Sequence, residues 1–254
     1  MSPLAISGIV FACVCSGALL GMLLRERLPE HHLSAESKDV VKLAMGLIGT
    51  MTALVLGLLI GAAKSSYDAQ RNGVAQLAAN IILLDRNLAH YGKDAQSARE
   101  LVRESVNDMI QRTWPGENPE SKPSEGGSRT EGRYEAVYDQ IQQLTPENDT
   151  QRAFQAQALK TGMDIAQIRW LLFSQKGGSI PTPFLVVMIC WLALILASFG
   201  LFAPRNATAL LALIVCSLAI SSSIYLILEL DRPFGGMIQV PSAALREALA
   251  LLGK

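Results

Sequence analysis

The chain has 254 residues, 50% of them apolar and 17% charged, and its mean hydropathy is +0.29. Because soluble proteins of this size are about one quarter charged, this composition excludes an ordinary soluble enzyme and a disordered chain. The 22 basic residues are matched by 22 acidic ones. No basic excess is available to neutralise phosphates, so we expect no nucleic-acid partner.

Four apolar runs predict an all-α membrane protein with four transmembrane helices. They cover residues 4–24, 43–63, 184–203 and 207–228. Each is long enough, because a spanning helix needs about 20 apolar residues to cross about 30 Å of hydrocarbon. The first run lacks the basic start of a signal peptide and exceeds its usual apolar length, so we expect a retained helix. Only residues 204–206 separate the last two runs, which predicts a tight antiparallel hairpin.

Four spans place both termini on one side of the membrane. With the N-terminus inside, seven basic residues near the membrane or in the tail lie in the cytoplasm, against five outside. This small excess favours cytoplasmic termini and a cytoplasmic central part. We therefore divide the chain into membrane segments 1–63 and 183–228, a central extramembrane part 64–182 and a C-terminal segment 229–254.

The central part predicts a long, coiled-coil-like helical hairpin. Apolar residues recur at alternating steps of three and four for about five heptads, beyond the three or four that a coiled coil requires. Only Gly73 and Gly92 permit a bend, so we expect one helix to continue from the second span to Thr113. A mobile loop over 115–132 and a short helix over 134–144 follow, and a second seam can pack antiparallel on the first. The first seam contains Val74, Leu77, Ile81, Leu84, Leu88, Tyr91, Ala95, Ala98, Val102 and Met109, and the second contains Phe154, Ala158, Thr161, Ile165, Ile168 and Leu172.

No arrangement of residues in the sequence indicates catalysis. His31 and His32 are adjacent in a short loop, and adjacent side chains diverge too much to share a zinc ion, which needs three or four donors. The four cysteines all lie inside apolar runs, where they act as small hydrophobic residues. With no phosphate loop and no nucleophile elbow, we expect neither an enzyme nor a cofactor or metal site.

The second span carries small residues on one face. These are Gly46, Thr50, Ala53, Gly57 and Gly61. Small residues allow helices to approach closely in lipid, which gives no hydrophobic drive for their association. One interpretation is therefore simple helix packing, as for Gly17 and Gly21 of the first span. The other is that second spans from several subunits converge on an axis, where this face lines a narrow pore or packs directly behind it.

Polar residues in and around the spans leave similar alternatives. The hydroxyls of Ser217, Ser221, Ser222 and Ser223 serve helix packing or line a polar path. Lys38 and Lys42, before the second span, either belong to a capped and charged helix start or form a pore mouth, and in a channel Lys64 and Asp68 would lie at the cytoplasmic mouth. After the fourth span comes a candidate gate or coupling segment, namely Glu229, Asp231, Arg232, Pro233, Phe234 and Gly235, followed by an amphipathic helix over 242–252.

The ending of the fourth span resembles that of the bestrophin anion channels, in which an acidic Pro-Phe-Gly stretch stands at this place. More closely, the chain resembles a bacterial bestrophin-like membrane family of unknown function. That resemblance rests on Leu-Ser-Ala-Glu-Ser-Lys-Asp-Val-Val at 33–41, Leu-Val-Leu-Gly-Leu-Leu at 54–59, Ala-Lys-Ser-Ser-Tyr-Asp at 63–68, Leu-Asp-Arg at 84–86 and Arg-Pro-Phe-Gly-Gly at 232–236.

The resemblance implies a pentamer with a neck built from the second span. This sequence differs from the bestrophin pattern in two ways. The bestrophin neck uses bulky apolar residues where this span is rich in glycine, and the acidic run of the calcium-gated members is replaced by Gly-Met-Ile-Gln at 236–239. Calcium gating is therefore not implied, and the sign of the ion stays open.

Two functions follow as expectations. The first is an oligomeric bacterial channel that passes small ions through an axial pore, with the lipid bilayer and other copies of the chain as its partners. The second is a non-conducting membrane scaffold or signalling protein that binds a partner through the coiled hairpin. An axial opening in the assembled protein would distinguish the two.

Overall fold

The computed structural model describes residues 2–27, 29, 35–115, 127–174, 180–204 and 206–254. The described residues form eight α-helices and one short 3-10 helix, with no strand among them. The chain divides into two compact units, of which unit 1 is Met1–Tyr67 with Gly178–Ile238 and unit 2 is Asp68–Gly177 with Gln239–Lys254. Helix α2 belongs to both units, because it runs from Ala35 to Tyr91.

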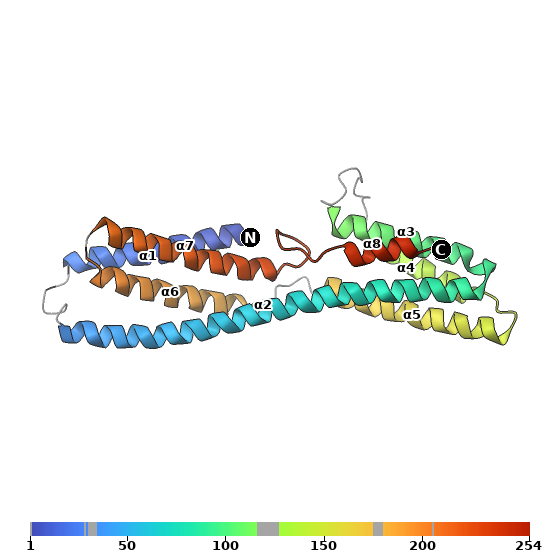
Figure 1. Cartoon of the computed structure of the whole chain (residues 1–254), viewed down its shortest axis with the longest axis horizontal. Helices are drawn as coiled ribbons and strands as arrows, with labels where there is room; N and C mark the ends of the chain where they lie inside the picture. Colours follow the sequence, from blue (N-terminus) through green and yellow to red (C-terminus); the bar gives the residue numbers. More distant parts are fainter. Residues whose placement is uncertain (1, 28, 30–34, 116–126, 175–179, 205) are drawn as a thin grey trace. The chain divides into compact units, whose positions relative to one another are not determined.

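Unit 1 contains the four helices that are long and apolar enough to cross a membrane (Figure 1). They are α1 (Pro3–Arg27), the first part of α2, α6 (Thr182–Phe202) and α7 (Ala207–Leu230). The predicted spans are thereby confirmed as candidate spanning helices. Local signals explain two of their starts: a proline lies in the first turn of α6, and the Asn206 side chain caps α7 by accepting a hydrogen bond from the Ala209 N–H at 2.9 Å.

Helices α1 and α6 pack closely against each other at glycine residues. A Cβ atom added to Gly17 would lie 2.8 Å from the carbonyl oxygen of Ala193, and one added to Gly21 or Gly200 would overlap the backbone of the opposite helix. Such close approach gives the van der Waals contact that holds helices together in lipid. For Gly17 and Gly21, simple helix packing is therefore the correct interpretation.

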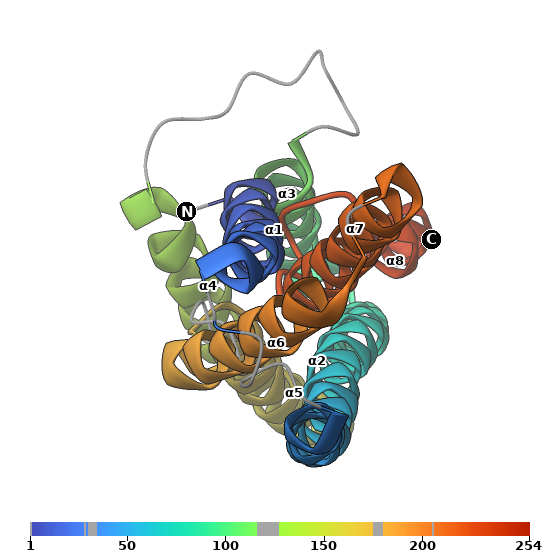
Figure 2. The same cartoon turned by 90° about the vertical axis from the view of Figure 1, so that its left-hand side faces the viewer.

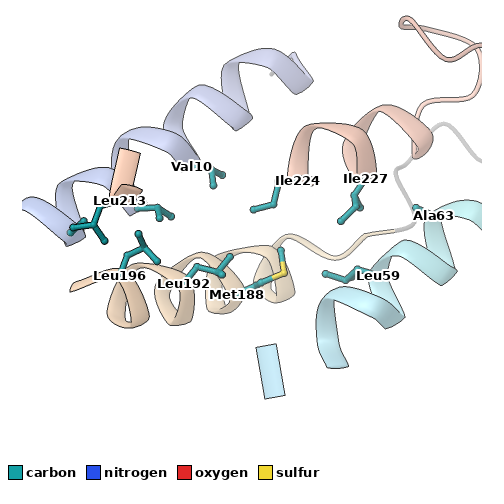
Figure 3. Packing of buried hydrophobic residues seen from close by; sticks show 11 residues of the cluster. Val10, Leu59, Ala63, Met188, Leu192, Leu196, Leu213, Ile224 and Ile227 are labelled. Atoms are coloured by element: carbon teal, nitrogen blue, oxygen red, sulfur yellow. The ribbon is translucent and has the colours of Figure 1, made fainter. Parts of the chain in front are cut away.

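The core of unit 1 lies along α6. Figure 3 shows Val10 of α1, Leu213 and Ile224 of α7, and Leu59 of α2 directed toward the α6 side chains. Seen from the end in Figure 2, α6 lies between α1 and the beginning of α2. Helix α2 thus packs on the rest of unit 1 with one face, and in the part of the chain that the structure describes the residues of the opposite face are exposed.

The prediction of one continuous helix from the second span to Thr113 is wrong, because the helix is interrupted in unit 2. Helix α2 ends at Tyr91, a 3-10 turn covers Lys93–Ala95, and α3 (Gln96–Thr113) follows. The break falls at Gly92, whose φ of 124° is a conformation that residues with a side chain rarely adopt. The heptad pattern continues across this break, because the first seam remains buried on both helices. The apolar pattern alone therefore could not reveal the turn.

Helices α4 (Gly127–Gln142), α5 (Asp149–Ser174) and α8 (Ala243–Leu251) complete unit 2. The His90 ring stacks on Phe154 at 5.3 Å, and Leu172 lies against Gly73. The start of α5 therefore lies beside the end of α2, and the two helices run antiparallel. Helix α4 begins at Gly127, so residues 127–132 are helical rather than part of the predicted loop, since no proline follows Pro123 in that stretch. The rest of that loop, from residue 116, lies outside the described residues.

Candidate functional site

Helix α2 has one buried and one exposed face within unit 1. Thr52, Leu59 and Ala63 are buried, and the Thr52 hydroxyl donates a hydrogen bond to the Ile48 carbonyl at 2.7 Å. The predicted small face lies on the other side, where all five of its residues are exposed. These are Gly46, Thr50, Ala53, Gly57 and Gly61. The structure therefore places the five on one exposed face of α2, where Gly46 also borders a hollow shared with α6.

The glycines of this face differ from those of α1. A Cβ atom added to Gly46, Gly57 or Gly61 would meet nothing within 4 Å. The Thr50 hydroxyl is bonded to the Leu47 carbonyl of its own helix at 2.8 Å. Beside this face lie exposed leucines, with Leu54 and Leu58 each 67% exposed. Packing inside one chain explains none of these small residues.

Charged residues lie at both ends of the apolar part of α2. Lys42 forms an ion pair with Asp39 at 3.6 Å, in which both side chains are about 70% exposed. Lys38 is half-buried in the same turn. At the other end, Lys64 is exposed and Asp68 is half-buried. His31 and His32 lie outside the described residues.

The serines of α7 all donate hydrogen bonds to backbone carbonyls. Ser217, Ser222 and Ser223 each donate to a carbonyl of their own helix at 2.8–3.0 Å. Ser221 instead donates to the Ser7 carbonyl of α1 at 2.7 Å. Such bonds satisfy hydroxyls inside an apolar bundle, so packing accounts for Ser217 and Ser221, which are buried.

The segment after α7 folds back onto the buried carboxylate of Glu229. Glu229 is 3% exposed and accepts a hydrogen bond from the Met237 N–H. Between Glu229 and Met237 the chain forms a turn, in which the Gly235 N–H donates a hydrogen bond to the Arg232 carbonyl at 3.2 Å. Gly236 has a φ of 143°, and a Cβ atom there would overlap the Glu229 carboxylate. The sequence did not predict the contact of Glu229 with Gly236 and Met237, because the hydrogen-bond donor to Glu229 is a backbone N–H, which carries no sequence signal.

Unit 2 holds the C-terminal residues through two buried groups. The Trp114 indole N–H donates to the Val240 carbonyl at 2.7 Å, and Trp114 is 2% exposed. Asp85 is also 2% exposed and binds Arg99 through both oxygens, at 2.7 and 3.0 Å. The Gly253 N–H lies 3.4 Å from the same carboxylate. Hydrogen bonding to Asp85 raises the pKa of the Arg99 guanidinium.

Asp85 appeared in the sequence only as part of a family signature, and its partners lie 14 and 168 residues away. No local pattern could pair it with them. Among the described residues, no group of three His, Cys, Asp or Glu side chains is placed to hold a metal ion. The chain thus carries three candidate features. They are an exposed small-residue face on α2, charged residues at both ends of its apolar part, and a closed turn after α7.

A comparison with protein families matches residues 12–245 to the Bestrophin-like domain. No curated protein matches the chain. Among solved structures, one variant of a bacterial bestrophin homologue from Klebsiella pneumoniae is 15% identical with a TM-score of 0.63, covering 97% of this chain and 98% of that one. Another variant of the same homologue is 14% identical with a TM-score of 0.66 and the same coverage. At such identities the likeness shows the fold.

Proposed function

The chain belongs to the bestrophin-like family, and from this premise we propose that copies of it assemble into an ion channel of a bacterial inner membrane. In this proposal α2 lines the axial pore, and bestrophin-like proteins are typically channels rather than enzymes. The observation that carries the proposal is the small-residue face of α2, whose five residues are all exposed in the single chain. By analogy with bestrophins, the assembly is a pentamer.

The uncovered face supports assembly around an axis. A membrane helix exposes leucine to lipid at no cost, but a row of glycine, threonine and alanine gains nothing from lipid contact. The same row allows several helices to approach one axis closely. A narrow pore lined by this face would select ions by its width and polar lining, with charges at its mouths adding an electrostatic bias. We assign the mouths to Lys38 and Lys42 at one end and to Lys64 and Asp68 at the other.

We place the termini and residues 64–182 in the cytoplasm, where the antiparallel helices of unit 2 form the coiled-coil-like hairpin. The segment from Glu229 to Gly235 then couples the two units. It follows the last span directly, and residues 239–254 beyond it belong to unit 2, where Trp114 binds the Val240 carbonyl. This short closed turn is therefore the direct covalent path from the C-terminal residues to α7, and α2 is a second connection between the units.

Ion flux tests the channel. Full-length protein is purified, reconstituted into liposomes and assayed with anion- and cation-sensitive dyes over a range of salt and pH. We expect flux from the native protein and a loss of at least about tenfold for Gly57→Leu, because a large side chain on the small face narrows the pore. The control Gly8→Leu adds the same side chain to α1, where a Cβ atom meets nothing, and it should conduct normally. An oligomer that passes no ion under any condition contradicts the proposal.

The scaffold alternative is favoured by one observation. A hollow of about 650 Å³ lies among α2, α3, α4 and α5 of unit 2, and Trp170 on its border is 72% exposed. Hollows of this size accept ligands or partner side chains. Particle images of the purified protein separate the two functions, since the channel requires a ring of copies with an axial opening and the scaffold does not.

A further inference from the structure

A second hollow, in unit 1, lies between the beginning of α2 and the end of α6, and we propose that it binds one anionic phospholipid of the bilayer. Its volume is about 520 Å³. It is lined by Lys42, Met45, Gly46 and Gly49 of α2 and by Ile195, Ser198, Phe199, Phe202 and Ala203 of α6. The site goes beyond the proposed channel and does not depend on ion conduction.

The depth of the hollow identifies hydrocarbon as its filling. Lys42 is the last residue before the apolar run 43–63. Gly49 lies seven positions after Lys42, and at a rise of 1.5 Å per residue the two are about 10 Å apart along the helix. The hollow therefore begins at the edge of the membrane and reaches into its apolar region. A hollow with apolar walls such as Met45 and Ile195 gives water too few polar partners, whereas an acyl chain fits it.

The mouth of the hollow carries two cations from different helices. Lys42 lines it directly, and the Arg25 guanidinium of α1 donates a hydrogen bond to the carbonyl of Ala203, which also lines it. A phosphate is the natural counterion for cations at the membrane surface. The ion pair of Lys42 with Asp39 does not prevent this, because both side chains are largely exposed and such pairs are weak.

Two glycines keep the hollow open. A Cβ atom added to Gly46 or Gly49 would meet nothing within 4 Å, so the first atom of a larger side chain enters the hollow without a clash. Gly49→Leu therefore blocks the proposed acyl-chain site, and Lys42→Gln weakens the proposed phosphate site. The matched controls are Gly8→Leu, in open space on α1, and Lys64→Gln, at the other end of the apolar run.

The experiment is native mass spectrometry of the full-length protein taken from bilayers of equal parts phosphatidylglycerol and phosphatidylcholine. We expect the native protein and both controls to retain phosphatidylglycerol preferentially, and Lys42→Gln to retain it about fivefold less, as the loss of one lysine at a membrane surface implies. Gly49→Leu should lose the bound lipid, and a photoactivatable phosphatidylglycerol should label peptide 195–203. Equal retention of the two lipids, retention unchanged in Gly49→Leu, or cross-linking of this hollow to a second copy of the chain would each overturn the proposal.

The experiment measures bound lipid and not ion flux. A negative result would therefore overturn the lipid site and not the channel, and a protein that conducts no ions could still bind the lipid. The assay also separates two roles of Lys42. A lysine that serves only the pore mouth would alter ion flux on substitution and leave lipid retention unchanged, which would overturn the assignment of Lys42 to the phosphate.

Discussion

Gly236 is the residue on which the turn after the last span depends. Its φ of 143° is rarely adopted by residues with a side chain, and a Cβ atom there would overlap the carboxylate of Glu229. Gly236→Ala should therefore lower the stability of the folded protein by about 1–3 kcal/mol. Thermal unfolding in detergent, followed by tryptophan fluorescence, measures the loss.

The neighbouring glycine provides the control for this substitution. A Cβ atom at Gly235 meets nothing within 4 Å, so Gly235→Ala should unfold close to the native temperature. Equal destabilisation by the two variants would mean that the turn tolerates no side chain at all. The contact between Gly236 and Glu229 would then not be the cause.

Tyr91, the last residue of α2, connects stability to pH. It is 2% exposed, and its hydroxyl has no hydrogen-bond partner in the described part of the chain. Burial, with the charges of Asp94 and Glu147, raises the pKa of the Tyr91 phenol above its usual value. The folded state thus holds this proton more tightly than the unfolded state. The stability from this group is complete below the ordinary tyrosine pKa and is lost as the pH rises through the raised one.

Tyr91→Phe should remove this alkaline loss. At neutral pH the variant should be as stable as the native protein or more stable by about 1 kcal/mol, because a buried hydroxyl without a partner is costly. Unfolding curves between pH 8 and 11 test this, with Tyr138→Phe as the control, which should keep the native pH profile. A variant that loses stability at neutral pH would show that the hydroxyl is bonded.

At the scale of helices, the two sets of glycines in the spans predict opposite mutational results. Gly21→Ala on α1 drives a Cβ atom into the α6 backbone near Ala197, whereas Gly57→Ala on α2 places it in open space. Because backbone atoms cannot yield as a flexible side chain does, Gly21→Ala should cost about 1–3 kcal/mol, and Gly57→Ala should fold normally. Size-exclusion chromatography after graded heating in detergent compares them. Equal tolerance of both would contradict the close α1–α6 packing.

The same glycines show what the sequence can and cannot predict. Apolar run length predicts all four spanning helices, because a bilayer demands about 20 apolar residues wherever a helix crosses it. Gly17 with Gly21 and Gly57 with Gly61 have identical spacing, so only the position of a neighbouring helix distinguishes a packed pair from an exposed one. Likewise the residues of the first seam are buried, yet their spacing continues across Gly92, where the chain turns.

At the scale of the molecule, the two units are linked by covalent chain but should respond separately to damage. Asp85 tests this, because it joins α2, α3 and the C-terminal residues of unit 2 through Arg99 and Gly253. Replacing one member of a buried ion pair leaves the other charge unpaired and typically costs 3–5 kcal/mol. Asp85→Asn keeps the shape but removes the charge, so it should destabilise unit 2 by about 3 kcal/mol.

Hydrogen–deuterium exchange locates that loss. Protection should fall in residues 68–115, 127–174 and 239–254 of Asp85→Asn and stay native in α1, α6 and α7, because the ion pair lies wholly inside unit 2. Asp149→Asn is the control, since its pair with Arg152 is almost fully exposed and should not change exchange measurably. The double variant Asp85→Leu with Arg99→Met replaces the pair by apolar groups and should recover much of the protection. Equal loss across α1, α6 and α7 would show instead that the two units unfold as one, so that damage in unit 2 reaches the spanning helices.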